Sequence, residues 1–406
     1  MDMVKVKPFR ALRPVKELAQ DVAAPAYDVM NRTQARAYVA DKPYSFMNID
    51  RPETQFHEDH DMYAADVYTK ANEMIQAWKA QGIFVQDAKA SFFLYEQTWK
   101  DHVQTGIVAL SAIDDYLDGS IRRHENTLPA KEQDRIRHID TTSCQSGLIF
   151  LAYRAQKDLE DIMRAIKESE PEYVFEDDGV THKAWVVDES LTALIQNAFD
   201  NIDGTYIADG HHRMASAVKV GLARRKAHPD YTGEEDFNYV MSILYPDDAL
   251  TILPYHRLVK AKVPENILNL LGQNFDVRKD KAMPEAKGAI AMRMGEVWYH
   301  LKAKDDVLLS RALDPVMSLD TSLLQECVLS PAFGITDPTS DARLSFLGGD
   351  IDPDMPLPGD EILFVMHATD IGDLFEVADA GELMPPKSTW FYPKPYSGLF
   401  LHEIER

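Results

Sequence analysis

The sequence predicts a mixed α+β protein, and three observations support this class. Segments with helical spacing of apolar residues alternate with short segments rich in β-branched and aromatic residues. These helices and strands do not follow the long regular βαβ rhythm of a fully parallel sheet. The length of 406 residues suggests two or three domains with ample buried core. We expect an N-terminal α/β part over 1–110, a core over 111–260 and a C-terminal α/β part over 261–406.

The composition restricts the partners of this chain. The formal net charge is −23, which disfavours duplex nucleic acid because neutralising phosphates requires a basic surface. No apolar run approaches the roughly 20 residues of a membrane helix, and the first residues carry no apolar signal core. Cys144 and Cys327 lie in no CxxC or Cys/His cluster, so both are expected reduced and buried. We expect a cytoplasmic protein without membrane contact, and a homo-oligomer is compatible with the sequence.

The N-terminal part contains the clearest predicted helix, in the segment "HDMYAADVYTKANEMIQAWKAQG". Its apolar residues recur at three- and four-residue steps from Ala64 to Trp78, and Gly82 is placed to end the helix. A pair of strands follows, "ASFFLYEQTW" and "VQTGIVALSAID", joined by a polar turn.

The middle of the chain alternates between the two kinds of element. We expect a strand in "SGLIFLAYR", a helix over 156–171 and a second helix in "ESLTALIQNAFDNI". Between these helices, "YVFEDDGVTHKAWVVDE" predicts a hairpin with Asp-Gly at its turn. The strand "FNYVMSILYP" and the extended segment "LTILPYHRLV" come later.

The last third begins with a predicted helix, "KVPENILNLLGQNF", and a hairpin whose turn contains Gly295. The segment "DTSLLQECVLSPAF" is expected to be helical, with Asp320 as its N-cap. The tail "LMPPKSTWFYPKPYSGLF" should be ordered but irregular. Its residues 387–390 are candidates for a lid, although packing of Trp390 and its aromatic neighbours against the core is favoured.

The segment "TYIADGHHRMASA", residues 205–217, is the first candidate functional site. An apolar strand precedes a tight turn at Asp209-Gly210. The following helix begins at His211 or His212 and is expected to extend to about Lys226. A helix N-terminus presents unpaired N–H groups and about half a positive charge.

Basic side chains at this helix start oppose the helix dipole, and a bound anion would reverse that cost. Arg213 offers a planar fork for phosphate oxygens, while His211 and His212 add donors. Alternatively, Asp209 caps the helix and the basic side chains are solvated or paired with it. The sequence contains no GxxxxGK[ST], GxGxxG or GxSxG motif, so phosphate binding would not use those devices.

A metal site at this helix start is disfavoured. Adjacent residues on a helix, such as His211 and His212, point about 100° apart, whereas paired ligands lie three or four residues apart. We therefore assign no metal ligand.

The segment "RRHENTLPAKEQDRIRH" is a second candidate. Lys131, Arg135 and His138 recur at four- and three-residue steps along a predicted helix, and His124 and Glu125 precede it. One interpretation is a solvated charged helix. The other is a row of cations facing a substrate, with Glu125 as a general base or metal-binding carboxylate. Under this interpretation His124, Lys131 and Arg135 bind the substrate.

Short N-terminal loops form a third candidate. The segments "KPFRALRP", "APAYDVM" and "KPYSFMNIDRPE" carry Arg10, Arg13, Tyr27, Asp28 and Arg51. Loops on a scaffold often hold binding groups, although turns use such residues freely. Arg10 is the third cation, after Lys131 and Arg135, that could hold a substrate carboxylate.

The combination "VKPFRALRP…VAAPAYDV…PYSFMNIDRPE…QTGIVAL…RRHENT…KEQDRIRH…YIADGHHRMASA…MPPKSTWFYPKPYSGLF" resembles the family catalogued as domain of unknown function 1015. The resemblance covers essentially the whole chain. That family is grouped with the ParB/sulfiredoxin-like superfamily, whose shared mark is a Gly-x-x-Arg turn that binds nucleotide phosphates. Gly210, His211, His212 and Arg213 match this mark. The resemblance implies that residues 111–260 form a ParB/sulfiredoxin-like nucleotide-binding core.

The superfamily includes DNA-partition proteins, sulfiredoxins and a free-serine kinase. His211 stands where sulfiredoxin has its reactive cysteine, and this acidic chain has no evident helix-turn-helix. The Asp209-Gly210-His211 turn most resembles that of the kinase. With the turn at the helix start, the resemblance leads us to expect an ATP- or ADP-dependent, Mg²⁺-assisted phosphotransferase acting on a small hydroxyl-bearing metabolite such as serine. A carboxylate should orient or deprotonate the acceptor hydroxyl, and the candidates are Glu125 and Asp209. A non-catalytic nucleotide or metabolite sensor is the alternative.

Overall fold

The computed structural model describes residues 4–405, which divide into two compact units. Unit 1 contains residues up to 122, then 126–250, and the chain from 393 onward. Unit 2 contains 123–125 and 251–392. The chain therefore enters unit 2 briefly at 123–125, builds most of it from 251–392 and returns to unit 1 for its last residues.

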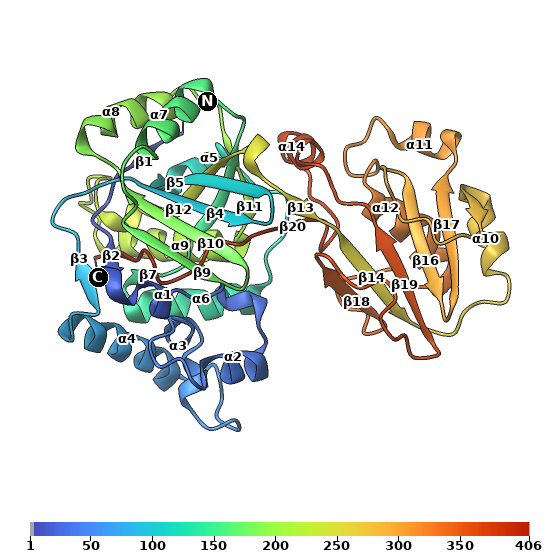
Figure 1. Cartoon of the computed structure of the whole chain (residues 1–406), viewed down its shortest axis with the longest axis horizontal. Helices are drawn as coiled ribbons and strands as arrows, with labels where there is room; N and C mark the ends of the chain where they lie inside the picture. The colour runs from blue at the N-terminus through green and yellow to red at the C-terminus, as the bar shows by residue number, and fades with distance from the viewer. Residues whose placement is uncertain (1–3, 406) are drawn as a thin grey trace. The chain divides into compact units, whose positions relative to one another are not determined.

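A large mixed sheet forms the centre of unit 1 (Figure 1). Its nine strands are β1 (Val6–Lys7), β4 (Phe93–Trp99), β5 (His102–Ala112), β6 (Ile121–Arg122), β8 (Ile149–Tyr153), β9 (Tyr173–Asp177), β10 (Val180–Val186), β11 (Thr205–Asp209) and β12 (Tyr239–Pro246). The order is β6-β11-β8-β12-β5-β4-β10-β9, with β1 also paired to β5. The β6–β11 and β8–β12 pairs are parallel and the others antiparallel. The mixed sheet confirms the predicted α+β class.

Helices pack against this sheet, and Figure 1 shows α7 and α8 beside each other next to it. Apolar residues of the sheet, α7, α8 and α9 share one hydrophobic cluster, which includes Leu151, Leu159, Phe199 and Met214. The helices following the first long strands are α5 (Ile113–Asp118), α6 (Pro129–Thr142), α7 (Lys157–Ile166), α8 (Thr192–Phe199) and α9 (His211–Ala227).

The first 90 residues build a second hydrophobic cluster of unit 1, in which Ile49, Ile75 and Trp78 are buried. The α-helices here are α1 (Ala19–Val22), α2 (Arg32–Val39), α3 (Met47–Asp50) and α4 (Ala65–Ala80). The short strands are β2 (Leu12–Pro14), paired with β3 (Phe84–Gln86), and β7 (Cys144–Gln145), paired with β21 (His402–Glu403). Single 3₁₀ turns in unit 1 are η1 (Lys16–Leu18), η2 (Tyr27–Val29), η3 (Pro52–Gln55), η4 (Glu189–Leu191), η5 (Asp236–Asn238) and η6 (Asp247–Ala249).

Several local predictions in unit 1 are confirmed. The helix ending before Gly82 is α4, and the predicted strand pair is β4 and β5. The predicted Asp-Gly hairpin is β9 and β10, where Asp178 and Gly179 have φ of 48° and 70°. Positive φ at both residues is typical of the type I′ turn. Cys144 and Cys327 are free and buried, as expected.

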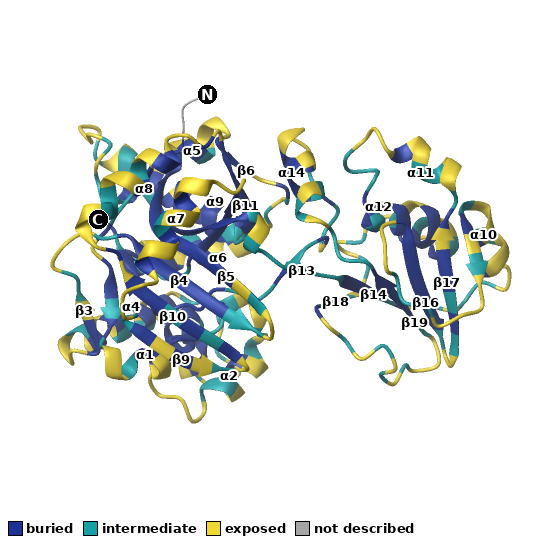
Figure 2. Cartoon of the chain, turned by 45° about the horizontal axis from the view of Figure 1, so that its top comes forward, coloured by how far each residue is buried: buried dark blue, intermediate teal, exposed yellow. Residues whose placement is uncertain are grey.

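Unit 2 is built on a six-stranded antiparallel sheet, coloured yellow to red in Figure 1. The strands, in spatial order, are β15 (Phe275–Arg278), β17 (Val297–Ala303), β16 (Ala289–Met294), β19 (Glu361–Met366), β14 (Tyr255–Lys260) and β18 (Leu344–Gly348). Two short strands, β13 (Ile252–Leu253) and β20 (Trp390–Phe391), pair separately. Figure 2 shows the central strands of both units as buried.

The helices of unit 2 are α10 (Ile267–Asn274), α11 (Asp305–Arg311), α12 (Asp320–Leu324), the π-helix η7 (Gln325–Leu329), α13 (Ser330–Phe333) and α14 (Ile371–Asp379). The predicted N-cap Asp320 is wrong, because Leu319 is the N-cap and makes no side-chain cap. Asp320 instead accepts a hydrogen bond from the Gly288 backbone at 2.8 Å.

The predicted part boundaries fall elsewhere than the junctions between the units. The boundary at 110/111 lies within β5, and that at 260/261 lies at the end of β14. Within residues 4–405, no helix has the length and apolar character needed to cross a membrane.

Candidate functional site

The turn between β11 and α9 has the predicted position and a conformation that favours glycine. Gly210 is the N-cap of α9 and has φ +96°, in the left-handed region. The helix begins at His211, and no side chain of the cap residue satisfies its first N–H groups. The Asp209 side chain pairs with Arg213 of the first helical turn at 2.7 Å. The first turn retains the positive electrostatic character of a helix N-terminus.

Arg213 lies directly beneath this turn and is only 9% exposed. A Cβ on Gly210 would lie 3.0 Å from Arg213 Nε, and one on Gly147 would lie 3.2 Å from Arg213 Cδ. The side chain is thus enclosed between two glycine backbones. Its Nη1 donates to the Leu148 carbonyl, and its Nη2 donates to Asp209 Oδ2 at 2.7 Å. Its buried Nε has no hydrogen-bond partner within the part of the chain that the structure describes.

Asp209 contacts two cations. Its Oδ2 pairs with Arg213, and its Oδ1 accepts a hydrogen bond from Lys394 Nζ at 2.7 Å. Burial lowers the pKa of both basic groups, but Asp209 and Asp28 outweigh it, so the pKa values of Arg213 and Lys394 are raised. Both cations therefore remain charged next to the turn.

A cavity of about 170 Å³ lies beside α6 in unit 1, and we call it the tyrosine cavity. It combines aromatic walls with groups of both charges, including two of the predicted substrate-binding cations. Its lining residues are Tyr27, Asp28, Arg51, Pro52, Glu53, Met62, Tyr63, Val67, Tyr68, Lys131, Asp134, Arg135 and His212. The N-terminal loop residues and the predicted cationic helix face thus meet at one cavity.

A smaller cavity of about 30 Å³, which we call the inner cavity, shares Tyr27 and Arg135 with the tyrosine cavity. Arg213 and Ser146 also line it. Because Arg135 and Tyr27 border both spaces, the α9 turn and the tyrosine cavity are parts of one continuous polar region of unit 1.

Arg135 is buried at the wall between the cavities. Its guanidinium pairs with Asp134 at 2.8 Å, and its Cζ lies 4.2 Å from the centre of the Tyr27 ring. Burial opposes the charge, but Asp134 and other neighbours raise the pKa of Arg135. Burial in turn raises the pKa of Tyr27 to about 12, so this phenol stays protonated at neutral pH.

Asp50 supplies a buried carboxylate to the inner cavity. Its Oδ1 accepts a hydrogen bond from Ser146 Oγ at 2.7 Å. His138, the third member of the predicted cationic row, bonds through Nε2 to the Ile49 carbonyl at 2.9 Å. Burial and the nearby Arg135 lower the pKa of His138, so this imidazole is neutral at pH 7.

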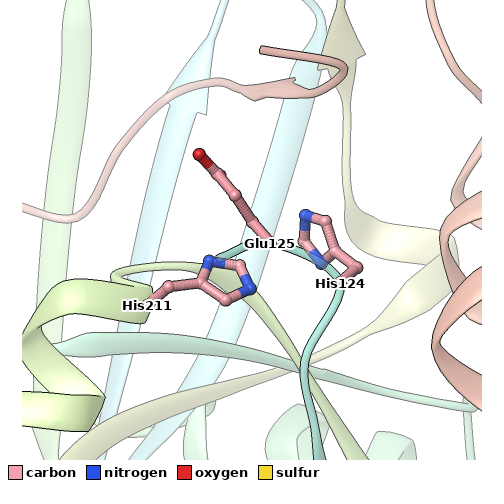
Figure 3. Close-up of side chains that lie close together, drawn as sticks. All are labelled: His124, Glu125 and His211. Atoms are coloured by element: carbon pink, nitrogen blue, oxygen red, sulfur yellow. The ribbon is translucent and has the colours of Figure 1, made fainter. Parts of the chain in front are cut away.

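The chemical groups of His124, Glu125 and His211 come together, as Figure 3 shows. One potential ligand atom from each residue lies within 4.8 Å of the other two. Two imidazoles and one carboxylate suit zinc or iron better than Mg²⁺, which prefers oxygen ligands. His212 is not in this group, as expected if the side chains of adjacent helical residues point in different directions. The Nε2 of His212 instead accepts a hydrogen bond from the Leu128 backbone at 2.9 Å.

Of the predicted substrate-binding residues, Lys131 borders the tyrosine cavity and Arg10 does not. Lys131 is exposed at the rim of the tyrosine cavity. Arg10 lines neither the tyrosine cavity nor the inner cavity and donates through Nε to the Asp87 carbonyl at 2.9 Å. Arg13, from the same loop, pairs with the Asp87 carboxylate at 2.7 Å.

Sequence reasoning missed Lys394 and Asp50. Lys394 belongs to the tail motif "FYPKPYSGLF", whose unusual sequence indicates a functional segment. The candidate lid residues of the sequence analysis, 387–390, lie four to seven positions before it. Asp50 stands in "MNIDRPE" as an acidic residue at the end of α3. Nothing in its spacing indicates that Ser146, nearly 100 residues later, completes its environment.

The family model described as "Protein of unknown function (DUF1015)" matches residues 6–322. No curated protein matches the chain. Truncated SbnI from Staphylococcus aureus is 13% identical with a TM-score of 0.39, covering 70% of this chain and 82% of SbnI. A free serine kinase in complex with AMP is 12% identical with a TM-score of 0.37, covering 74% of this chain and 91% of the kinase.

A conserved hypothetical protein from Pyrococcus furiosus is 14% identical with a TM-score of 0.33, covering 72% of this chain and 93% of that protein. Similarity at these scores is too low to assign a function, which therefore depends on the residues of this chain.

Proposed function

This chain belongs to the DUF1015 family, and from the geometry of its site we propose that it is a nucleotide-dependent phosphotransferase for a small hydroxyl-bearing metabolite such as free serine. The observation that carries the proposal is the left-handed Gly210 at the start of α9 with the buried Arg213 guanidinium against it. This pairing matches the Gly-x-x-Arg turn and supports a ParB/sulfiredoxin-like nucleotide-binding core.

The phosphates of ATP or ADP would lie against the α9 turn. Gly210 has no Cβ, so a phosphate can approach its backbone closely. The N–H groups and dipole of α9 favour an anion there, and His211 and His212 add side-chain donors. Arg213 still has an unused buried Nε, and a charge-assisted hydrogen bond to phosphate would satisfy it.

The acceptor metabolite would occupy the tyrosine cavity. Its volume of about 170 Å³ suits a small polar molecule such as an amino acid. Lys131 has an ammonium at the rim and Arg135 a guanidinium in the wall, so either can hold a carboxylate of the acceptor. We assign Arg10 no role here, because it lines neither this cavity nor the inner one.

In the transfer step, the acceptor hydroxyl oxygen forms a bond to the terminal phosphorus, and the bond from phosphorus to the leaving nucleotide oxygen breaks. The hydroxyl proton passes to a carboxylate, for which the candidates are Glu125 and Asp209. Each Asp209 oxygen already accepts a hydrogen bond from a cation, which favours Glu125 as the base. Phosphoryl transfer otherwise depends mainly on positioning and charge neutralisation.

Mg²⁺ would accompany the nucleotide and neutralise phosphate charge when bound. The carboxylates of Asp28 and Asp134 line the tyrosine cavity and are oxygen donors of the kind Mg²⁺ prefers. Asp134 also accepts a hydrogen bond from Tyr68 at 2.9 Å, which orients it, while Asp28 is exposed.

A non-catalytic nucleotide sensor is the second candidate. The observation that favours it is the double pairing of Asp209 with Arg213 and Lys394, which gives this carboxylate a structural role. A sensor would keep the phosphate site at α9 and need no base.

The test is nucleotide turnover by the purified protein with ATP or ADP, Mg²⁺ and a panel of hydroxy amino acids. We expect phosphorylated product, loss of nucleotide binding in Arg213→Met, and partial retention in Arg213→Lys as a charge-preserving control. Glu125→Gln should bind nucleotide normally but lose turnover. Binding without turnover in the unmodified protein would favour the sensor, and an absence of binding would reject both functions.

A further inference from the structure

The strongest unassigned feature near the site is Lys394, which the last segment of the chain brings to the α9 turn. Its ammonium lies 2.7 Å from Asp209 Oδ1, while Arg213 Nη2 lies 2.7 Å from the other oxygen of the same carboxylate. Two cations are thus held by one carboxylate, at the residue immediately before Gly210. The Lys394 side chain is only 16% exposed, so this placement is not that of a freely solvated surface lysine.

The backbone around Lys394 is fixed by two buried glutamines. Gln97 Nε2 donates to the Lys394 carbonyl at 2.9 Å, and Gln104 Nε2 donates to the Pro393 carbonyl at 2.7 Å. Gln97 and Gln104 are opposite each other on β4 and β5, are both 0% exposed, and are joined by a hydrogen bond of 2.9 Å. Burying an amide without partners is costly, and here the Nε2 donors of both glutamines are used to hold the tail.

Further anchors follow immediately in the chain. Tyr396 OH donates to Asp177 Oδ2 at 2.9 Å, and Ser397 exchanges two backbone hydrogen bonds with Ala24. Prolines on both sides of Lys394 restrict its backbone further. The segment therefore holds Lys394 in place over β4, β5 and the start of α9.

The charges explain why a lysine is useful at this position. Asp209 opposes any anion at the α9 turn, and Arg213 alone would only balance it. Lys394 makes this group of three residues net positive, and its raised pKa keeps it charged although burial disfavours the charge. An anion that approaches the turn meets two fixed cations, although the Asp28 carboxylate also acts on both of them.

We propose that Lys394 is a phosphate-binding residue of the nucleotide site, and that Gln97 and Gln104 are positioning residues that hold it there. This inference rests on the proposed function, because it places the nucleotide phosphates at the α9 turn. It adds to that function a contribution from the C-terminal tail, which neither the Gly-x-x-Arg turn nor α9 supplies.

The experiment compares the dissociation constants of ADP and adenosine, measured by calorimetry on the full-length protein. Lys394→Met should weaken ADP binding roughly tenfold or more, as expected for one lost charge-assisted hydrogen bond. Adenosine has no phosphate, so its binding should not change. Lys394→Arg should restore most of the ADP affinity. Gln97→Leu should also weaken ADP selectively, but less, because the ammonium remains present.

Lys226→Met is the control, because it removes one positive charge from unit 1 at an exposed position at the far end of α9. It should leave both dissociation constants unchanged. If Lys394→Met does not fold, Lys394→Gln retains an N–H donor for Asp209 and tests the same loss of charge.

Equal weakening of ADP and adenosine would overturn the proposal, because it would indicate a general structural defect. Unchanged ADP affinity in Lys394→Met would overturn it too, while the proposed function would stand if Arg213→Met still lost ADP binding. An unmodified protein that binds no nucleotide would reject the proposed function and this role together.

Discussion

Gly210 and Arg213 depend on each other more closely than their spacing in the sequence indicates. The glycine adopts the left-handed conformation of the turn, and its missing side chain leaves space for the guanidinium. The arginine in turn binds the Leu148 carbonyl and Asp209, which joins the turn to the neighbouring strand segment. A change at either residue should therefore affect both the turn and the anion site.

Gly210→Ala should lower the free energy of unfolding by about 1–2 kcal/mol, the usual cost of a left-handed L-residue. It should also weaken nucleotide binding, because its Cβ would lie 3.0 Å from Arg213 Nε and displace the guanidinium. Gly233→Ala is the matched control, since Gly233 has φ +98° and nothing within 4 Å of an added Cβ. The control should lose similar stability but keep its nucleotide affinity. Equal affinity in the two variants would contradict the proposed contact.

Asp115 provides a pH-dependent contribution to stability away from the site. It is buried in α5 and accepts a hydrogen bond from the Lys5 backbone at 2.7 Å. Burial raises its pKa from 3.8 to about 6, so the folded protein binds this proton more tightly than the unfolded chain does. Its contribution to stability is therefore greatest below pH 4 and is lost as the pH rises to about 6.

Asp115→Asn keeps an acceptor for the Lys5 backbone and removes the buried charge. We expect it to stabilise the protein at pH 7 by the order of 1 kcal/mol, with the gain shrinking as the pH falls from 6 to 4. Urea unfolding at several pH values measures this difference. Asp203→Asn, an exposed aspartate, is the control and should show no such trend. A gain that is independent of pH would contradict the assignment to Asp115.

At the level of the elements, helix α9 connects the site to the core. It is buried on several sides, and its Gly221 packs against the 3₁₀ turn η5 and against α5. Any movement of α9 would displace Gly210 and Arg213 at its first turn. Close packing along the helix therefore fixes the position of the anion site.

Gly221→Ala should destabilise the protein by about 1–3 kcal/mol through overpacking. An added Cβ would overlap the Phe237 carbonyl oxygen and lie 2.9 Å from Ile113 Cδ1. Gly272→Ala in α10 is the matched control, because an added Cβ there meets nothing within 4 Å. The control should gain up to about 1 kcal/mol from higher helix propensity. Urea unfolding of both variants decides the matter, and a gain in Gly221→Ala would reject close packing at this position.

Individual elements could be predicted from the sequence, because their signals are local. The apolar spacing of α4, the Asp-Gly turn of β9–β10 and the strand–turn–helix at Gly210 each depend on neighbouring residues. The sheet order could not be predicted, since β11 lies beside β8 and β6, which come from distant segments. The same limit applies to the candidate site. The Gly210–Arg213 turn could be predicted because it is local, whereas Lys394 could not, because it is 185 residues away from Asp209.

At the level of the whole molecule, unit 1 is discontinuous in sequence. Its last segment contributes Lys394 and the buried residues Leu399, Phe400 and Leu401 to unit 1. The two ends of the segment 251–392 are adjacent, because the Tyr392 backbone donates to the Thr251 carbonyl at 3.2 Å and β13 pairs with β20. Unit 2 therefore has the character of an insertion, with entry and exit close together.

Replacing residues 251–392 with a short Gly/Ser linker should leave a folded unit 1. The linker spans only the short distance between the paired ends, and unit 1 retains its own hydrophobic clusters. We expect a cooperative thermal transition and nucleotide binding, since the α9 turn, Lys394 and both site cavities belong to unit 1. Ending the chain at residue 392 is the opposing control.

The chain that ends at residue 392 should be less stable than the linked variant and should bind nucleotide poorly. It lacks the buried tail residues and Lys394, so it loses apolar packing and one cation of the site together. Circular dichroism melting and calorimetry with ADP compare the two proteins directly. If the linked variant unfolds without cooperativity, unit 1 does not fold independently. If the shortened chain binds ADP as well as the full-length protein, the tail does not contribute to the site.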